Sequence, residues 1–235
     1  MSIRPPLPIA ASPVSSLPIP RRLKDFGRDL VPALAVGGVA LITSLGLALL
    51  YPGQLPGWTV EHGPIESLTV IGYGVVGALA LYLWPRLGAV AGLVALLALL
   101  MALREIDAHA AFTRFGIFSS RLYFRPDVPV AEKLGAGVAV LGLAGLLFWA
   151  VRRAWPRLLV QGGRIGISFG ALVLVALLLK QLDALPRQLR RLGIPFDADT
   201  LALSRAIEEV GEAFLPALLV LVLVAALTTR TSPKA

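Results

Sequence analysis

Acidic, histidine and arginine side chains gather in three short segments of this chain, at 61–66, 104–109 and 205–212. Carboxylate and imidazole groups can transfer protons or bind metal ions, and guanidinium groups can hold anions. The ionisable residues of the three segments are Glu61, His62, Glu66, Arg104, Glu105, Asp107, His109, Arg205, Glu208, Glu209 and Glu212. Because their surroundings in the sequence are largely apolar, these are the first candidates for a functional site.

Helical spacing brings several of them onto shared faces, since residues three and four apart in a helix are neighbours. Glu105 and His109 form one such pair. The third segment places its charged residues at i, i+3, i+4 and i+7, which draws a polar stripe along an apolar helix. Three carboxylates within five residues repel one another unless a cation offsets them. The candidate cations are Arg104, Arg121, Arg205 or a bound metal ion.

The first hypothesis is a metal-dependent, hydrolase-like enzyme that acts on a lipid or another amphipathic substrate. In it a metal activates water, a spare glutamate acts as the base and an arginine holds an anionic group. The expected metal ligands, a mixed nitrogen and oxygen shell suited to zinc, iron or manganese, are Glu66, Glu105, His109, Glu208 and Glu212. The expected catalytic residues are Glu105, His109, Glu209 and Arg104. The expected substrate-binding residues are Arg121, Arg205 and His62.

Other functions fit the same residues. A metal-free acid and base pair, ion- or proton-coupled transport, assembly of a membrane complex and a purely structural bundle all remain open. Glu66 and Arg104 also suit the first and last turns of helices, where the helix dipole favours a carboxylate and a cation respectively. Glu61 and His62 also suit a solvated loop.

Separated apolar blocks must position these residues. The chain of 235 residues is 57% hydrophobic and only 15% charged, and its apolar residues fall into blocks of the length that a helix needs to cross a bilayer. The blocks lie at 31–51, 64–84, 88–105, 134–151, 164–182 and 207–228. In lipid each must be a helix, because no water satisfies open backbone groups. The predicted fold class is therefore all-α, a polytopic membrane bundle of about six transmembrane helices.

The predicted organisation has three parts. Residues 1–30 form a proline-rich, basic, disordered cytoplasmic segment, residues 31–229 form the transmembrane domain, and residues 230–235 form a short cytoplasmic tail. A second, short interfacial helix is expected over 185–192, and Asp199 or Thr200 is expected to cap the last span.

Charge gives the orientation and the expected partners. With both termini in the cytoplasm of a bacterial-type cell, the inner segments carry far more basic than acidic residues, and all three ionisable segments lie at the outer edge of the inner membrane. The net charge of +8 suits anionic head groups, so membrane lipids and possible neighbouring membrane proteins are the expected partners, with no nucleic acid. The chain has no cysteine, which excludes disulfides and thiolate metal sites.

Three motifs carry a resemblance. They are Glu-His-Gly-Pro-Ile-Glu-Ser-Leu-Thr at 61–69, Arg-Glu-Ile-Asp-Ala-His-Ala-Ala-Phe-Thr at 104–113 and Glu-Glu-Val-Gly-Glu at 208–212. They resemble the polar signatures of small bacterial inner-membrane proteins of uncharacterised function, a likeness that covers the spans and implies no activity. The segment 61–69 also resembles ceramidase-like membrane hydrolases, whose zinc is held by several histidines. This chain has two histidines, so that resemblance implies a hydrolase only if carboxylates replace imidazoles.

Overall fold

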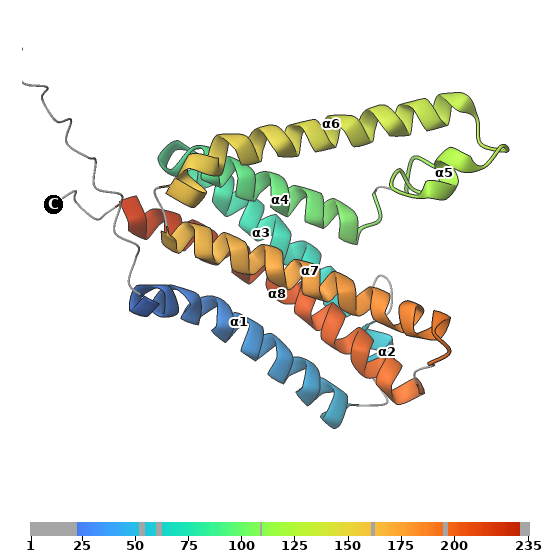
Figure 1. Ribbon diagram of the computed structural model, residues 1–235, viewed down its shortest axis with the longest axis horizontal. Helices are drawn as coiled ribbons and strands as arrows, with labels where there is room; N and C mark the ends of the chain where they lie inside the picture. The colour runs from blue at the N-terminus through green and yellow to red at the C-terminus, as the bar shows by residue number, and fades with distance from the viewer. Residues whose placement is uncertain are drawn as a thin grey trace, which may run out of the picture.

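The structure is a computed structural model that describes residues 23–51, 55–59, 63–108, 110–160, 163–194 and 197–230. Within these ranges the chain is helical and contains no strand. The helices are α1 (Leu23–Leu50), α2 (Leu55–Trp58), α3 (Pro64–Leu87), α4 (Ala89–Glu105), α5 (Ser120–Phe124), α6 (Val130–Trp155), the π-helix η1 (Pro156–Val160), α7 (Gly163–Arg191) and α8 (Ala198–Arg230) (Figure 1).

The predicted class of fold, an all-α polytopic membrane bundle, is confirmed. Five helices are long and apolar enough to cross a membrane, namely α1, α3, α6, α7 and α8. The block predicted at 88–105 forms α4, which has 17 residues and is therefore about 25 Å long. That length is at the lower limit for a span.

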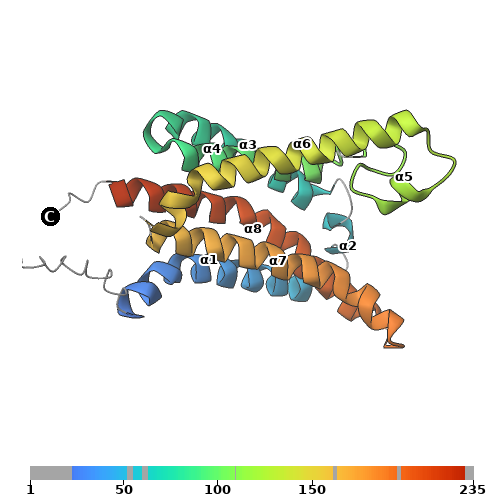
Figure 2. The same ribbon diagram turned by 45° about the horizontal axis from the view of Figure 1, so that its top comes forward.

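Helix α8 is the centre of the bundle. It packs against α7, α1, α3 and α4, and α3 and α4 form a tight hairpin (Figures 1 and 2). In the most apolar stretch of α8, 61% of the residues are buried, against 11% in α6. Helix α6 packs on α4 and η1, and its large side chains, such as Val138 and Leu141, are exposed. In a membrane those side chains meet lipid, which explains why α6 needs no polar face.

The bundle has two chemically different ends. We call the end that holds Pro64, Glu105, Val130 and Ala198 the loop end, and the end that holds Leu87, Trp155, Gly163 and Arg230 the turn end (Figure 1). Helix α1 begins and α8 finishes at the turn end (Figures 1 and 2).

Several local expectations are corrected by the structure. Helix α1 begins at Leu23, so residues 23–30, predicted as part of the disordered segment 1–30, are helical, while the apolar part of α1 that could span a membrane, Leu30–Leu50, agrees with the predicted block 31–51. The separate interfacial helix predicted over 185–192 is wrong, because α7 continues through Pro186 to Arg191. Its end is set by Gly193 in the left-handed region, with the amide of Ile194 donating to the carbonyl of Leu189.

The start of α8 is also earlier than predicted. Asp197, rather than Asp199 or Thr200, is the cap, since its carboxylate accepts a hydrogen bond of 2.6 Å from the amide of Thr200. Hydrogen bonding by Thr200 to the carboxylate lowers the pKa of Asp197 below its ordinary value. Residues 1–22 of the segment predicted over 1–30, and residues 231–235 of the tail predicted over 230–235, lie outside the described residues.

The loop between α4 and α6 is organised around a small apolar cluster of its own. Leu122 and Val128 are buried against Ala136 of α6, with Phe115 and Tyr123 packed beside them. The Tyr123 hydroxyl donates to the carbonyl of Ile117 at 2.7 Å. This cluster holds α5 against the first half of α6, away from the helices that form the candidate site (Figures 1 and 2).

Candidate functional site

The candidate site lies between α4 and α8 toward the loop end. Arg104 and Glu105 occupy the last turn of α4, and Glu212 lies near the middle of α8. The Arg104 guanidinium is 2.8 Å from a carboxylate oxygen of Glu212 and 3.3 Å from one of Glu105. The carboxylate side chains are only 9% and 7% exposed, whereas that of Arg104 is 40% exposed. One guanidinium therefore serves two buried carboxylates and connects them to the surface of the bundle.

The end of α4 fixes the direction of these two side chains. Asp107 has a positive φ of 50°, and the amide of Ala108 donates to the carbonyl of Leu103. The amide of Asp107 donates to the carbonyl of Arg104, which completes a Schellman cap. The helix thus stops directly after the two charged residues, and Asp107 turns the chain away.

Tyr73 of α3 is part of the site, and the sequence reasoning missed it. The residue is 1% exposed, and its hydroxyl has no hydrogen-bond partner among the described residues. The hydroxyl interacts electrostatically with Glu105, Glu212 and Arg104. A buried hydroxyl without a hydrogen-bond partner is costly, so this position of Tyr73 beside the charged residues calls for an explanation.

A signal for Tyr73 was present in the sequence. Glu66, Thr69 and Tyr73 follow i, i+3 and i+7, the same kind of polar stripe that singled out α8. Thr69 is buried and donates to the carbonyl of Ile65, so its hydroxyl is satisfied within the helix. Tyr73 is the buried member of the stripe whose hydroxyl has no hydrogen-bond partner among the described residues.

The other two α8 glutamates face different neighbours. Glu209 interacts electrostatically with Glu212, Glu105 and Glu66, so it belongs to the same site. Glu208 interacts with Asp183 and Lys180 of α7, and also with Glu212 and Arg104. The predicted stripe therefore has one branch toward α3 and α4 and another, through Glu208, toward α7, and the two branches interact electrostatically.

The α7 branch is an ion-pair network. Asp183 accepts hydrogen bonds from Lys180 at 2.5 Å and from Arg187 at 2.9 Å. The carboxylate of Asp183 thus has two cationic partners, whereas Glu105 and Glu212 share one.

Of the candidate cations, the structure selects Arg104. Arg205 is exposed on α8, and Arg121 is exposed on α5. Neither forms an ion pair with any side chain in the described part of the chain, so the structure does not bring these two predicted substrate-binding residues to the site.

The predicted metal site has no support in the described residues. Within the parts of the chain that the structure covers, no group of three or more acidic or histidine side chains is arranged to hold a metal ion. Arg104 lies between Glu105 and Glu212, where a shared metal would have to bind. Glu66 lies in the first turn of α3, while Glu61, His62 and His109 lie outside the described residues.

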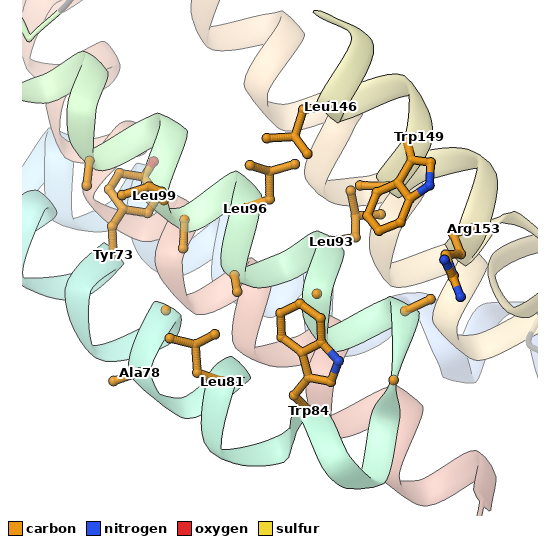
Figure 3. Close-up of a pocket in the computed structure, with 18 of the residues that line it drawn as sticks. Tyr73, Ala78, Leu81, Trp84, Leu93, Leu96, Leu99, Leu146, Trp149 and Arg153 are labelled. Atoms are coloured by element: carbon orange, nitrogen blue, oxygen red, sulfur yellow. The ribbon is translucent and has the colours of Figure 1, made fainter. Parts of the chain in front are cut away.

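A large apolar cleft adjoins the site. It has a volume of about 900 Å³ and runs between α3, α4 and α6, with Tyr73 at one end and Arg153 at the other (Figure 3). Ala102, two residues before Arg104, also lines it. Tyr73 therefore belongs both to the cleft and to the charged site.

A scan against protein-family models, a search of curated proteins and a search of solved structures each found no match to this chain.

Proposed function

We propose that the protein is a membrane protein that takes up and releases a proton at a site formed by Tyr73, Arg104, Glu105, Glu209 and Glu212, which we call the acidic site. The observation that carries this proposal is the shared cation, because a single guanidinium contacts both Glu105 and Glu212. Glu209 adds a further carboxylate and forms no ion pair with any side chain described.

The physical reason is the cost of uncompensated charge away from water. Within apolar helices, carboxylates must find partners or bind protons or cations, because solvation by water is lost. When two carboxylates share one cation and a third lies close by, binding one proton removes the excess negative charge. The acidic site therefore favours a state that carries an exchangeable proton.

The carboxylates, the guanidinium and the phenol of the acidic site then have different roles. Glu105, Glu209 and Glu212 are the proton-binding groups, and Arg104 keeps the remaining charge neutral. Because the Arg104 side chain is 40% exposed, its movement gives a route between the buried carboxylates and the loop end. The Tyr73 hydroxyl can donate to a carboxylate that has lost its proton, which supports release.

Infrared difference spectroscopy during a pH titration of the purified protein tests this directly. A protonated carboxylic acid has its own carbonyl band, and we expect this band to shrink in Glu209→Gln and in Glu105→Gln. Asp127→Asn is the matched control, because Asp127 pairs with Arg125 on an exposed loop far from the acidic site. A titrating band that is the same in all three variants would reject the proposal.

Coupling to transport needs a second measurement. In liposomes with an internal pH-sensitive dye, the wild type is expected to dissipate a proton gradient faster than Glu212→Gln. Equal rates would limit the function of the acidic site to proton binding or to the stability of the bundle.

The orientation proposed with this function places the turn end in the cytoplasm of a bacterial cell, with both termini inside. Its support is the row of arginines near that end, and cytoplasmic ends of membrane helices are rich in such residues. Since the chain has no cysteine, single cysteines report accessibility cleanly. An impermeant maleimide should label Ser120→Cys on intact cells and Arg86→Cys only after permeabilisation. The opposite pattern would reverse the orientation.

A second candidate function is an acid–base enzyme for an amphipathic molecule bound in the cleft. The observation that favours it is the position of Tyr73, which lines the cleft and has no hydrogen-bond partner within the described residues. A metal-dependent form would recruit His109 and displace Arg104 from Glu105. Elemental analysis of the wild type beside a Glu105→Ala/His109→Ala variant distinguishes the two forms, since only the metal-dependent form predicts bound metal that the variant loses.

A further inference from the structure

The cleft between α3, α4 and α6 exists because its floor is made of small residues. Glycines and alanines of α3 and α4, among them Gly74, Gly77 and Ala95, leave space that a larger side chain would fill. A Cβ atom added to Gly74 would have no neighbour within 4 Å. Helix α6 packs against the bundle near the turn end, where Ala150 and Ala154 are buried. Toward the loop end, α6 diverges from the bundle and contacts mainly the small cluster around α5.

The lining of the cleft is apolar along its length and polar at its ends. The walls are leucines of all three helices together with Trp84 and Trp149, and the ends are marked by Tyr73 and Arg153 (Figure 3). Such a largely apolar lining suits a hydrocarbon chain.

The Arg153 end has the chemistry of a head-group site. The Arg153 guanidinium lies over the ring of Trp149, 5.2 Å from its centroid, and Trp84 lies across the cleft (Figure 3). Tryptophans are enriched at the level of the head groups, where arginine binds phosphate. Arg153 forms no ion pair with any side chain in the described part of the chain, so its charge is available to an anion.

Neighbouring basic groups strengthen the preference for an anion. Arg86 and Arg152 are exposed near the same end of the bundle. Arg157 is occupied differently, because it donates a hydrogen bond to the carbonyl of Leu87 at the end of α3. Arg153 is the one among these four arginines that lines the cleft itself.

We infer that this cleft is a binding site for an anionic phospholipid of the surrounding membrane. One acyl chain occupies the cleft between α3, α4 and α6, and the phosphate is held by Arg153 beside Trp149 and Trp84. Charge complementarity at the Arg153 end selects an anionic lipid over a zwitterionic one, and the apolar lining beyond it accommodates the acyl chain. The inference does not depend on proton exchange at the acidic site.

The test uses the full chain in nanodiscs of zwitterionic phosphatidylcholine, titrated with phosphatidylglycerol that carries brominated chains. Bromine quenches tryptophan fluorescence at short range, so in a Trp58→Phe/Trp155→Phe background, used for every protein compared, quenching reports occupancy of the cleft through Trp84 and Trp149. Brominated phosphatidylcholine of the same chain length is the reference ligand. We expect the wild type to prefer the anionic lipid.

Three variants separate head group from chain. Arg153→Gln is expected to lower the preference for phosphatidylglycerol about fivefold, the effect of one cation at an anionic surface, and Arg153→Lys should restore most of it. Arg152→Gln is the matched control and should behave as the wild type, because Arg152 does not line the cleft. Ala95→Phe, which fills the floor, should reduce quenching by both lipids.

Three outcomes would overturn the inference. One is equal quenching by the two lipids in the wild type, and another is the same loss in Arg153→Gln and Arg152→Gln. The third is a dimer, detected by native mass spectrometry, that Ala95→Phe dissociates, since a second copy would then occupy the cleft. Circular dichroism of each variant shows whether the helices are intact, and Arg153→Lys keeps the test valid if Arg153→Gln does not fold.

Discussion

The two ends of the bundle treat their charges differently. At the loop end, Arg104 pairs with Glu212 and Lys180 pairs with Asp183. At the turn end, Arg157 donates to a backbone carbonyl and Arg153 lies over an aromatic ring, and both partners are neutral. Arg104 and Lys180 form ion pairs with carboxylates of the protein and shape a site in the bundle. Arg153 has no carboxylate partner among the described residues, so it can bind an anion of the membrane. The loop end is thus suited to internal chemistry and the turn end to lipid.

Removing the Arg104 guanidinium at the loop end should lower the free energy of unfolding more than any other change considered. Arg104→Met leaves Glu105 and Glu212 buried without their shared cation, and we expect a loss of about 3 kcal/mol in the free energy of unfolding. Thermal or denaturant unfolding in detergent measures it.

Arg205→Met is the matched control for that prediction. Arg205 is a cation at the same end, yet it is exposed and has no ion pair among the described side chains, so the change should be within about 0.5 kcal/mol. In Arg104→Met, Glu212→Gln should recover part of the loss. Equal effects of the two arginine substitutions would show that the loop-end pair is not special.

The turn end should instead be most sensitive to backbone packing. A Cβ atom on Gly166 of α7 would clash with the carbonyl oxygen of Leu158 in η1, so Gly166→Ala must push the two backbones apart. We expect a loss of about 2 kcal/mol. Gly170→Ala, where nothing lies within 4 Å of the added atom, should be neutral or stabilising by up to about 1 kcal/mol. Identical effects on thermal unfolding would contradict the close approach.

A smaller effect is expected at Arg157, a turn-end arginine that contacts the backbone of another helix. Arg157→Met removes the donor to the Leu87 carbonyl, and the loss should be about 1 kcal/mol, the usual value of such a hydrogen bond. Arg152→Met removes a neighbouring charge without that contact and should change stability less. If both substitutions destabilise equally, general charge rather than the hydrogen bond sets the stability of this end.

The smallest effect concerns the cap of α8 at the loop end and depends on pH. Hydrogen bonds from Thr200 lower the pKa of Asp197 below its ordinary value of 3.8, so the cap stabilises the fold fully above that value. The contribution is lost as the pH falls through the lowered pKa of the folded state. Asp197→Asn cannot titrate, and its unfolding temperature should fall less than that of the wild type below about pH 4. A constant difference between the two proteins at every pH would contradict this assignment.

The elements that carry the site were largely predictable, because apolar length and polar spacing are properties of a single helix. The blocks at 64–84 and 207–228 correspond to α3 and α8, and the stripe that ends at Glu212 lies on α8 as expected. The start of α8 was misplaced because Asp197, Asp199 and Thr200 are all good capping residues, and a local pattern does not choose among them. The separate helix at 185–192 was wrong because Pro186 does not interrupt α7.

The sequence by itself determined that this is an all-helical membrane protein and which few ionisable residues lie within its apolar helices. Only the tertiary structure decided that Arg104, rather than Arg121 or Arg205, is the partner of Glu212, and that Tyr73 completes the acidic site. The cleft that ends at Arg153 was likewise decided by tertiary packing. The physical reason is that periodicity fixes the face of each helix on which a residue lies, while the register and tilt between helices depend on contacts between residues far apart in the chain.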